Sequence, residues 1–393
     1  MITARLSIIV TCFTIAFSSC KDDTPFEKDL NFLEKYDSVI VLSRGDAELI
    51  VSPKYQAKVF TSTTGDGLSH GWINYDVFDA PPDPHMNAYG GENRIWLGPE
   101  GGPFSLFFPK GFVMDFANWK IPAAFDTEPL ELVFATATNA LMQKDMKLAN
   151  YSGTEFFASV EREIIALDKV SIERLIGASY SDAIRSVGYM TKNRLTNTGS
   201  RAWNDSTGAP CIWILDMFTP SANTTVIIPF EGDTASRVNT NYFGKIPASR
   251  LKFRDGVLLF KADGKKRSKI GIPPDVARSI AGSYDPDKKT LTLTVFDIHP
   301  AAPYLNMEWT TEKPPFSGDA INAYNDGPLE DGRLLGPFYE LESVSPAAFL
   351  APGQSISHYH SVFHLTGSED LLDAVCKKTL GISLREVKKA MDE

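Results

Sequence analysis

The stretch GGENRIWLGPEGG, residues 90–102, places five glycines and one proline around a short apolar segment. Side chains alternate along a strand, so Arg94 and Trp96 would point to the same side of a sheet. An indole presents a flat apolar face to the C–H groups of a sugar ring, and a guanidinium donates hydrogen bonds to sugar hydroxyls. We therefore predict a sugar-contacting strand here, with Glu100 just beyond its end. The alternative is a structural hairpin in which Trp96 fills the core and Arg94 pairs with Glu100.

Short runs of β-forming residues continue on both sides of this stretch. Turn residues separate them, in a chain with 28 Gly and 25 Pro, and aromatic residues make up 11% of the sequence. The runs rarely alternate with helical patterns, which favours antiparallel pairing over βαβ units. We therefore predict an all-β fold, an antiparallel sandwich. Its strands are expected at residues 39–42, 48–51, 57–61, 131–136, 158–166, 212–215, 225–229, 257–260, 291–296, 336–341 and 357–365.

Helical patterns are confined to the two ends of the expected domain. Apolar residues recur at helical spacing over residues 26–36, which predicts a short amphipathic helix. Ser368 would cap one helix near the C-terminus, and a capping box at residues 383–386 would open a second.

The first twenty residues have the pattern of an export signal. Arg5 precedes an apolar run that is too short for a transmembrane helix, and two serines then precede Cys20. This arrangement resembles the cleavage site of bacterial lipoproteins, and the Lys-Asp-Asp that follows is similar to a surface-export signal of some Gram-negative lipoproteins. We predict residues 1–19 as a lipoprotein signal peptide, Cys20 as the lipidation site, residues 20–25 as a tether and residues 26–393 as a single domain. The protein would then be an outer membrane lipoprotein, periplasmic or on the cell surface, and only its lipid would contact the membrane. An ordinary secretion signal with a chance cysteine is the alternative.

The charge of the mature chain argues against nucleic acid as a partner. Removing residues 1–19 takes away one of 39 Lys and Arg residues and none of 49 Asp and Glu residues, which leaves a net charge of 38 − 49 = −11. An acidic chain repels phosphate backbones. The sequence leaves the oligomeric state open. Cys211 and Cys376, the cysteines after Cys20, could pair or remain buried thiols.

Several segments together resemble a known family of sugar-binding folds. The chain is similar to galactose-mutarotase-like (aldose-1-epimerase-like) domains, and more closely to a group of bacterial envelope lipoproteins with that fold. The resemblance implies a β-supersandwich of two large curved antiparallel sheets, with a sugar cleft on a concave face. The segments that carry it are residues 48–64, HGWIN at 70–74, GGENRIWLGPEGG at 90–102, 185–199, GDAINAYNDGP at 318–328, 338–346 and Pro352-Gly353.

The same resemblance implies two catalytic groups. In aldose epimerases a Glu deprotonates the anomeric hydroxyl and a His protonates the ring oxygen. Glu342 corresponds best to the base, and Glu340 would lie on the same strand face and raise its proton affinity. His70 and His85 are the N-terminal candidates for the proton donor. The alternative is that both glutamates are solvated strand carboxylates.

Three of the six histidines fall in one predicted strand. His358, His360 and His364 have the same parity, so all three would project from one face, where they could bind a ligand or chelate a divalent metal with a nearby glutamate. No cofactor is required by the other motifs. Such histidines are also common as core or hydrogen-bonding residues.

Two further segments have polar residues of interest. Asn322, Tyr324 and Asn325 combine amides with an aromatic ring and would contact sugar hydroxyls from a loop over the cleft, although this segment also reads as a turn. The charged run at residues 265–269 is predicted to be a solvated hairpin tip.

The sequence therefore favours an envelope lipoprotein that binds or processes a carbohydrate ligand, with acid–base chemistry at a sugar carbon. Two alternatives stay open: a binding or surface-assembly lipoprotein without catalysis, and a metal-dependent sugar enzyme that uses the histidine cluster. No phosphate-binding loop, GxSxG, HExxH or CxxC motif is present in the sequence.

Overall fold

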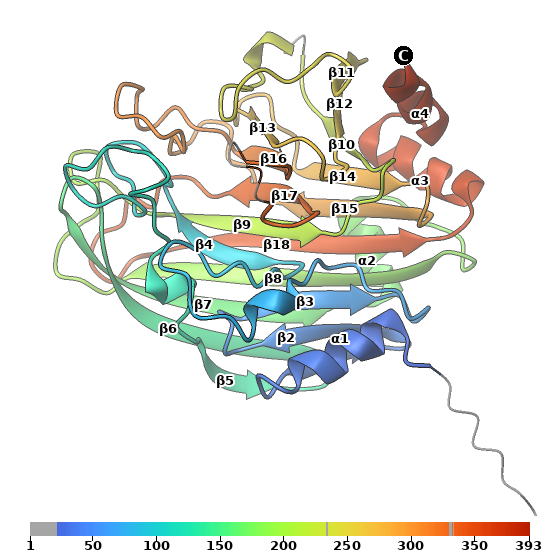
Figure 1. Cartoon of the computed structure of the whole chain (residues 1–393), viewed down its shortest axis with the longest axis horizontal. Helices are drawn as coiled ribbons and strands as arrows, with labels where there is room; N and C mark the ends of the chain where they lie inside the picture. Colours follow the sequence, from blue (N-terminus) through green and yellow to red (C-terminus); the bar gives the residue numbers. More distant parts are fainter. Residues whose placement is uncertain (1–21, 233–234, 330–331, 333) are drawn as a thin grey trace, which may run out of the picture.

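The computed structural model describes residues 22–232, 235–329, 332 and 334–393. The predicted signal peptide and the lipidation site Cys20 therefore lie outside the described residues. The described part consists mainly of strands in three antiparallel sheets, with four short α-helices (Figure 1). The all-β prediction is confirmed.

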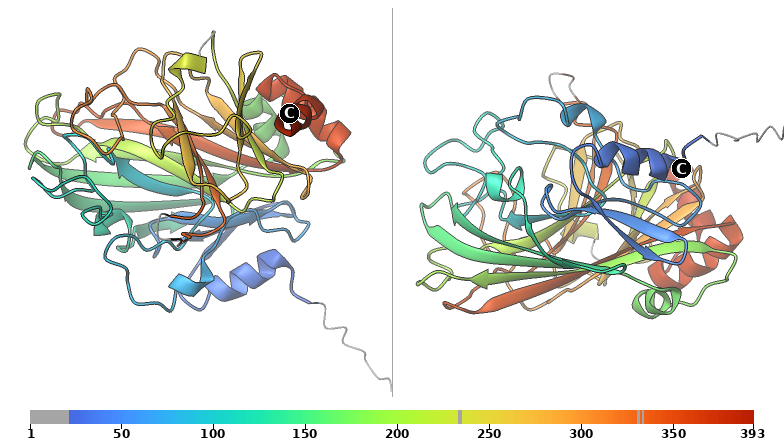
Figure 2. Two further views of the ribbon diagram at one scale, coloured as in Figure 1. Left: turned by 45° about the horizontal axis from the view of Figure 1, so that its top comes forward. Right: turned by 90° about the horizontal axis from the view of Figure 1, so that it is seen from below.

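The largest sheet has ten strands and forms a curved layer (Figure 2). Its longest members are β6 (Asn139–Ala149), β7 (Glu155–Ala166), β8 (Arg185–Asn197) and β18 (Ser355–Thr366). The first three largely alternate in burial because one face is packed and the other is partly open, whereas the second half of β18 is buried on both faces. In order across the sheet the strands are β11 (Leu251–Arg254), β12 (Val257–Lys261), β10 (Thr225–Pro229), β14 (Ile280–Asp285), β15 (Thr290–Phe296), β18 (Ser355–Thr366), β8 (Arg185–Asn197), β7 (Glu155–Ala166), β6 (Asn139–Ala149) and β5 (Glu131–Ala135).

Two smaller sheets cover one face of this layer. The five-stranded sheet runs in the order β13 (Ser268–Ile272), β16 (Ile321–Asn325), β17 (Tyr339–Val344), β9 (Cys211–Phe218) and β4 (Arg94–Gly98). The three-stranded sheet consists of β1 (Ile40–Arg44), β2 (Ala47–Ser52) and β3 (Lys58–Thr63). Side-chain hydrogen bonds join the layers, as between Ser343 of β17 and His358 of β18, 2.8 Å apart.

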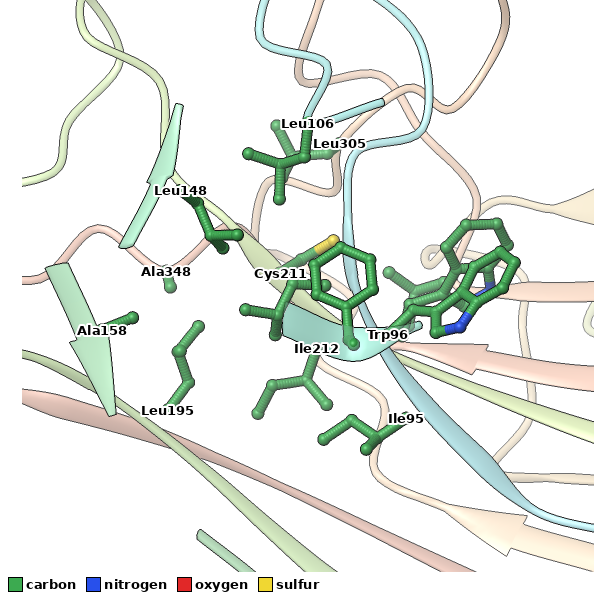
Figure 3. Close-up of a cluster of buried hydrophobic side chains, with 14 of the residues drawn as sticks. Ile95, Trp96, Leu106, Leu148, Ala158, Leu195, Cys211, Ile212, Leu305 and Ala348 are labelled. Atoms are coloured by element: carbon green, nitrogen blue, oxygen red, sulfur yellow. The ribbon is translucent and has the colours of Figure 1, made fainter. Parts of the chain in front are cut away.

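Apolar side chains fill the space between the layers. Ile95 of β4 and Ile212 of β9 pack in one cluster with Ala158 and Leu195 from the ten-stranded sheet (Figure 3). Burying such side chains contributes about 25 cal/mol for each Å² removed from water, which makes these interfaces the main stabilising contacts. On the opposite face of the ten-stranded sheet a separate apolar cluster is covered by α2 (Lys169–Ile176), α3 (Glu369–Leu380) and α4 (Leu384–Asp392).

The two C-terminal helices begin at the capping residues that the sequence indicates, and the N-terminal helix begins at a capping box that was not predicted. Thr24 forms a capping box with Glu27 at the start of α1 (Pro25–Leu33), and Ser383 does so with Glu386 at the start of α4. Ser368 is the N-cap residue of α3, although its side chain accepts no capping hydrogen bond. Three short 3₁₀ turns complete the elements: η1 (Tyr75–Val77), η2 (Ala123–Phe125) and η3 (Ala235–Arg237).

Two further findings concern cysteines and membranes. Cys211 and Cys376 are both free buried thiols, and they belong to different apolar clusters, so they do not pair. In the part of the chain that the structure describes, no helix is both long and apolar enough to cross a membrane.

Candidate functional site

One face of the five-stranded sheet points away from the ten-stranded sheet and carries many polar and aromatic side chains. We call it the outer face. The register pairs Trp96 with Trp213 and Glu340 with Met217 and Tyr324, and alternation along each strand then places these side chains on one side. The side chains on this face include Arg94, Trp96, Trp213, Leu215, Met217, Lys269, Asn322, Tyr324, Glu340 and Glu342.

A depression of about 80 Å³ lies on this outer face. A second depression, of about 370 Å³, adjoins it, because Glu100, Phe243, Arg267 and Lys269 line both. We call the two together the outer cleft. Loops far apart in sequence complete its walls, and they contribute Met86, Trp119, Phe243, Trp309, Leu335 and Phe338. The structure thus brings together Arg94, Trp96, Glu100, Tyr324 and Glu340, five of the residues that the sequence indicates.

Arg94 and Glu340 form a buried ion pair at the wall of the cleft, with their side chains 6% and 9% exposed. The guanidinium carbon of Arg94 also lies 4.9 Å from the centre of the Trp96 ring, which is a cation–π distance. Burial raises the pKa of Glu340 to about 7, against the opposing effect of Arg94 and with a further contribution from the nearby Glu342. Glu340 is therefore a carboxyl that can gain or lose a proton near neutral pH.

Glu342 lies on the same strand face but does not line the cleft. Its side chain is 0% exposed, and its Oε2 accepts hydrogen bonds from Trp213 Nε1 at 2.8 Å and Lys269 Nζ at 2.9 Å. Alternation along β17 does place Glu340 and Glu342 on the same strand face. The large side chains of Trp213 and Lys269 nevertheless cover Glu342. The structure therefore does not place Glu342 as a base that a ligand could reach, and Glu340 lies at that position instead.

Lys269 closes the floor of the cleft above Glu342. Burial alone would lower the pKa of Lys269, but the carboxylates of Glu342 and Glu100 outweigh this and raise it above its ordinary value. The ammonium also lies 4.8 Å from the centre of the Trp213 ring. Lys269 is thus a fixed positive charge, and the prediction that residues 265–269 are a solvated hairpin tip is wrong for this residue, because Ser268–Ile272 is a buried strand of the sheet.

Glu100 lines both depressions, and burial raises its pKa against the opposing charge of Lys269. A carboxyl with a raised pKa retains its proton to higher pH and can donate it. The alternative that Arg94 pairs with Glu100 does not hold, because the partner of Arg94 is Glu340.

Arg267 and Tyr324 form the opposite wall. The guanidinium carbon of Arg267 is 3.9 Å from the centre of the Phe243 ring, and its Nε donates to Tyr324 Oη at 3.2 Å. Tyr324 in turn donates to Asp326 at 2.9 Å, so its hydroxyl is held in place from both sides.

The two asparagines of the same segment do not line the cleft. Residues 321–325 form β16, an interior strand of the five-stranded sheet, and not a loop. Asn322 is buried and donates to Tyr242 Oη and the carbonyl of Ile270. Asn325 donates to the carbonyls of Lys266 and Asp326, which ties the strand end to the hairpin. Both therefore have structural hydrogen bonds, which side-chain type alone could not distinguish from ligand contacts.

The C-terminal histidines lie on the inner face, between the sheets, and not at the outer cleft. His360 is hydrogen-bonded through Nε2 to Asp216 at 2.7 Å and through Nδ1 to Ser343 at 2.8 Å, and His358 Nε2 contacts the same Ser343 oxygen. The prediction that they bind a ligand together with Arg94 and Trp96 is therefore contradicted. Their shared face was predicted correctly, but strand parity does not show which side of a sandwich faces the neighbouring sheet.

The same geometry contradicts the predicted metal role of His358, His360 and His364. The nitrogens of His364 contact Thr292 at 2.9 Å and Glu92 at 3.1 Å, so they are also engaged in the interior. Among the residues with described positions, no group of three or more His, Cys, Asp or Glu side chains could hold a metal ion.

The N-terminal histidines do not line the cleft either. His70 is buried and stacks on His364 with ring centres 4.1 Å apart. His85 contacts the carbonyl of Trp119 through Nδ1 at 2.6 Å, and it does not line either depression. None of the six histidines, all of which lie in described segments, lines the outer cleft.

Sequence reasoning missed Trp213, Lys269 and Arg267. The run CIWILDMF at Cys211–Phe218 is apolar on both faces of the strand, so polar and apolar residues do not alternate along it. The sequence therefore did not indicate that Trp213 faces the cleft. Lys269 lies in a charged run, which is typical of exposed turns, and only its strand pairing with Tyr324 buries it.

Comparison with known proteins places the chain in a family. Residues 24–391 match a family of unknown function, DUF6786. The chain belongs to this family. A search of curated proteins gives no match for this DUF6786 member.

Solved structures with the same fold are more distant. The DUF6786 chain is similar to a putative aldose 1-epimerase from Escherichia coli K12, with a TM-score of 0.50 and 13% identity over 83% of this chain and 98% of that one. It is also similar to the Slr1438 protein from Synechocystis sp. PCC 6803, with a TM-score of 0.50 and 14% identity over 84% and 96% of the two chains. A galactose mutarotase-like protein from Lactobacillus casei ATCC 334 has a TM-score of 0.45 and 10% identity over 83% and 100%. At these identities the likeness to the first two structures shows the fold, which is aldose-1-epimerase-like.

Proposed function

We propose that this protein binds a carbohydrate in the outer cleft and acts on it by acid–base chemistry through Glu340. The observation that carries the proposal is a carboxyl with a pKa of about 7 at the wall of a cleft lined by indole rings. Indoles bind sugar rings through their faces, and a base that titrates near neutral pH is suited to proton transfer. A role in carbohydrate chemistry in general is also what the putative aldose 1-epimerase among the similar structures suggests.

The chemistry that these groups could perform is the interconversion of sugar anomers. Ionised Glu340 would take the proton of the anomeric hydroxyl, the C1–O bond to the ring oxygen would break as a carbonyl forms, and an acid would protonate the ring oxygen. Glu100, which faces the same cleft with a raised pKa, is our candidate for that acid. Rotation about C1–C2 and the reverse steps give the other anomer, so no co-reactant is consumed.

The proposal includes the export of the protein as a lipoprotein. Its support is the order of the first twenty residues, with Arg5, an apolar run, two serines and Cys20. The next residues, Lys21 to Asp23, would then begin a tether, and α1 begins soon after at Pro25.

The experiment is a screen of mono- and oligosaccharides by titration calorimetry, followed by NMR exchange measurements of anomer interconversion for each ligand that binds. Wild type and Glu340→Gln are compared, with Glu161→Gln as the control, because Glu161 forms a partly exposed surface pair with Arg194. Anomer exchange that is accelerated by wild type and by Glu161→Gln, but not by Glu340→Gln, supports the proposal. Absence of binding to every saccharide refutes it.

A second candidate function is binding without catalysis. The observation that favours it is that none of the six histidines lines the outer cleft, whereas the resemblance to aldose epimerases implies a Glu and a His acting together. Binding with no accelerated exchange in wild type would support this candidate.

A further inference from the structure

We propose that the carbohydrate of the outer cleft carries a carboxylate and that Arg267 binds this group. This inference rests on the function proposed above, and it names the class of ligand. A sugar acid such as a uronate would meet this description, whereas a neutral hexose would not.

The first observation is the way in which Arg267 is held. Its guanidinium stacks on Phe243 at 3.9 Å, and its Nε donates to Tyr324 at 3.2 Å. Phe243 contacts the flat face of the guanidinium and Tyr324 contacts its Nε edge, so the orientation of the guanidinium plane is fixed. Its two Nη atoms form no hydrogen bond or ion pair with a described residue, and the side chain lines both depressions of the cleft. The outer end of the planar fork is therefore available to a ligand.

The second observation is the pairing of charges around the cleft. Arg94 is paired with Glu340, and Lys269 is paired with Glu342 at 2.9 Å. Arg267 forms no ion pair with any described carboxylate. The nearest acid of its hydrogen-bond chain, Asp326, accepts from Tyr324 at 2.9 Å and from the backbone N–H of Gly336 at 3.0 Å instead. Among the described cations that line the outer cleft, only Arg267 thus lacks a described carboxylate partner, which matches a ligand with one negative charge.

The shape of the group favours a carboxylate. A guanidinium binds a carboxylate through two parallel N–H···O bonds, and such charge-assisted pairs are about twice as strong as neutral hydrogen bonds. A dianionic phosphate would need a second unpaired cation, and the buried one, Lys269, already has its carboxylate. With the carboxylate on Arg267, the sugar ring would extend toward Trp96, Trp213 and the Glu340 carboxyl, which line the same depression.

The surrounding hairpin adds a local positive field to an acidic chain. Lys265 and Lys266 are exposed next to Arg267 and line a neighbouring hollow with it, whereas the whole chain has a formal net charge of −10. Such a field attracts anions toward the cleft but supplies no fixed geometry. Lys265 therefore offers a control that removes one charge without changing the cleft lining.

The test is titration calorimetry with matched ligand pairs: methyl glucuronide against methyl glucoside, and methyl galacturonide against methyl galactoside, with the 6-sulfated glycosides as a third arm. The variants are Arg267→Gln, Arg267→Lys, which keeps the charge but loses the fork, and Lys265→Gln. We expect wild type to bind a uronide at least about tenfold more tightly than its neutral partner. Arg267→Gln should remove that preference, so that the acidic and neutral ligands of each pair bind equally, Arg267→Lys should restore it in part, and Lys265→Gln should change it by less than about twofold.

The outcomes separate the two proposals. Equal binding of acidic and neutral sugars, or an acid preference that survives in Arg267→Gln, overturns this inference and leaves the proposed function standing. Tighter binding of the sulfated glycoside than of the uronide overturns the assignment of a carboxylate. If no saccharide of any kind binds, the proposed function fails and the inference fails with it.

Discussion

Trp213 donates its indole N–H to Glu342 at 2.8 Å, and this contact separates two glutamates that the strand pattern makes equivalent. Glu340 and Glu342 project from the same face of β17, but Trp213 and Lys269 cover only the second. Glu342 consequently fixes the position of Lys269, whereas Glu340 remains at the wall of the cleft with a pKa near 7. One residue supports the site and the other can react.

The first prediction concerns the stability of this arrangement. Glu342→Gln removes one charge of the buried pair with Lys269, and a buried charge without a partner is costly. We expect the free energy of unfolding, measured in urea, to fall by about 3 kcal/mol. Glu161→Gln breaks an exposed pair and should cost less than about 1 kcal/mol. Combining Glu342→Gln with Lys269→Met should be less destabilising than Lys269→Met alone, since that single change strands Glu342. Equal losses for Glu342→Gln and Glu161→Gln would contradict the buried pairing.

The second prediction concerns the pH dependence of catalysis. Burial raises the pKa of Glu340 from 4.5 to about 7, so the carboxyl is protonated at pH 5 and ionised at pH 8. If Glu340 is the base and Glu100 the acid, the pH profile of anomer exchange should be bell-shaped, with a limb near pH 7 set by Glu340 along which the rate changes by up to about tenfold per pH unit. Glu340→Gln should lose this limb. A rate that does not change between pH 5 and 8, or an unchanged limb in the variant, would show that another group is the base.

The third prediction concerns acid sensitivity of the interior. Burial lowers the pKa of His358 from 6.5 to about 3, with further contributions from His360 and His299. Because the folded-state value lies below the unfolded one, the contribution of the neutral ring is complete above pH 6.5 and is lost as the pH falls from 6.5 toward 3. The stability difference between wild type and His358→Gln should therefore shrink by about 1.4 kcal/mol per pH unit over that window. Parallel stability curves for the two proteins from pH 7 to 5 would argue against a buried neutral His358.

The fourth prediction concerns the role of the indole in binding. Trp96→Ala removes the aromatic face beside Arg94, and aromatic contacts contribute about 1 kcal/mol beyond their buried area. We expect at least about tenfold weaker binding of any saccharide ligand, with Trp96→Phe retaining part of the affinity. Trp203→Phe is the control, because Trp203 is buried but lines a different hollow. Unchanged affinity in Trp96→Ala would place the ligand elsewhere.

The fifth prediction concerns the membrane anchor. Cys20→Ser should abolish incorporation of a labelled fatty acid in a Gram-negative host and should move the protein from the membrane fraction to the soluble fraction. Labelling that persists in Cys20→Ser would show that the lipid, if present, is attached at another residue.

Much of the fold was predictable because its signals are local. The capping box at Ser383 depends on neighbours within four residues, and so does the position of Arg94 and Trp96 on one strand face. Both features are present in the structure. The missed elements lack such signals. Helix α2 has eight residues between two long strands, and β16 contains the turn-forming residues Asn322 and Asn325, which tertiary contacts hold in an extended conformation.

The site was predictable only in part, because the sequence shows which residues share a face but not what lies opposite that face. For His360 the opposing layer is the five-stranded sheet, where Ser343 and Asp216 engage both ring nitrogens. For Glu342 it is a pair of larger side chains from other strands. Each outcome depends on a contact between residues more than a hundred positions apart, His360 with Asp216 and Glu342 with Trp213, and no pattern within one segment encodes such contacts.

The most direct test of carbohydrate binding in the outer cleft is NMR of protein labelled with ¹⁵N at tryptophan, in which each indole N–H gives its own signal. Single Trp→Phe variants assign the signals of Trp96, Trp213 and Trp203. On addition of a saccharide that binds, the signals of Trp96 and Trp213 should shift and that of Trp203 should not, since only the first two line the cleft. Binding that shifts Trp203 and leaves Trp96 and Trp213 unchanged would contradict the proposed site.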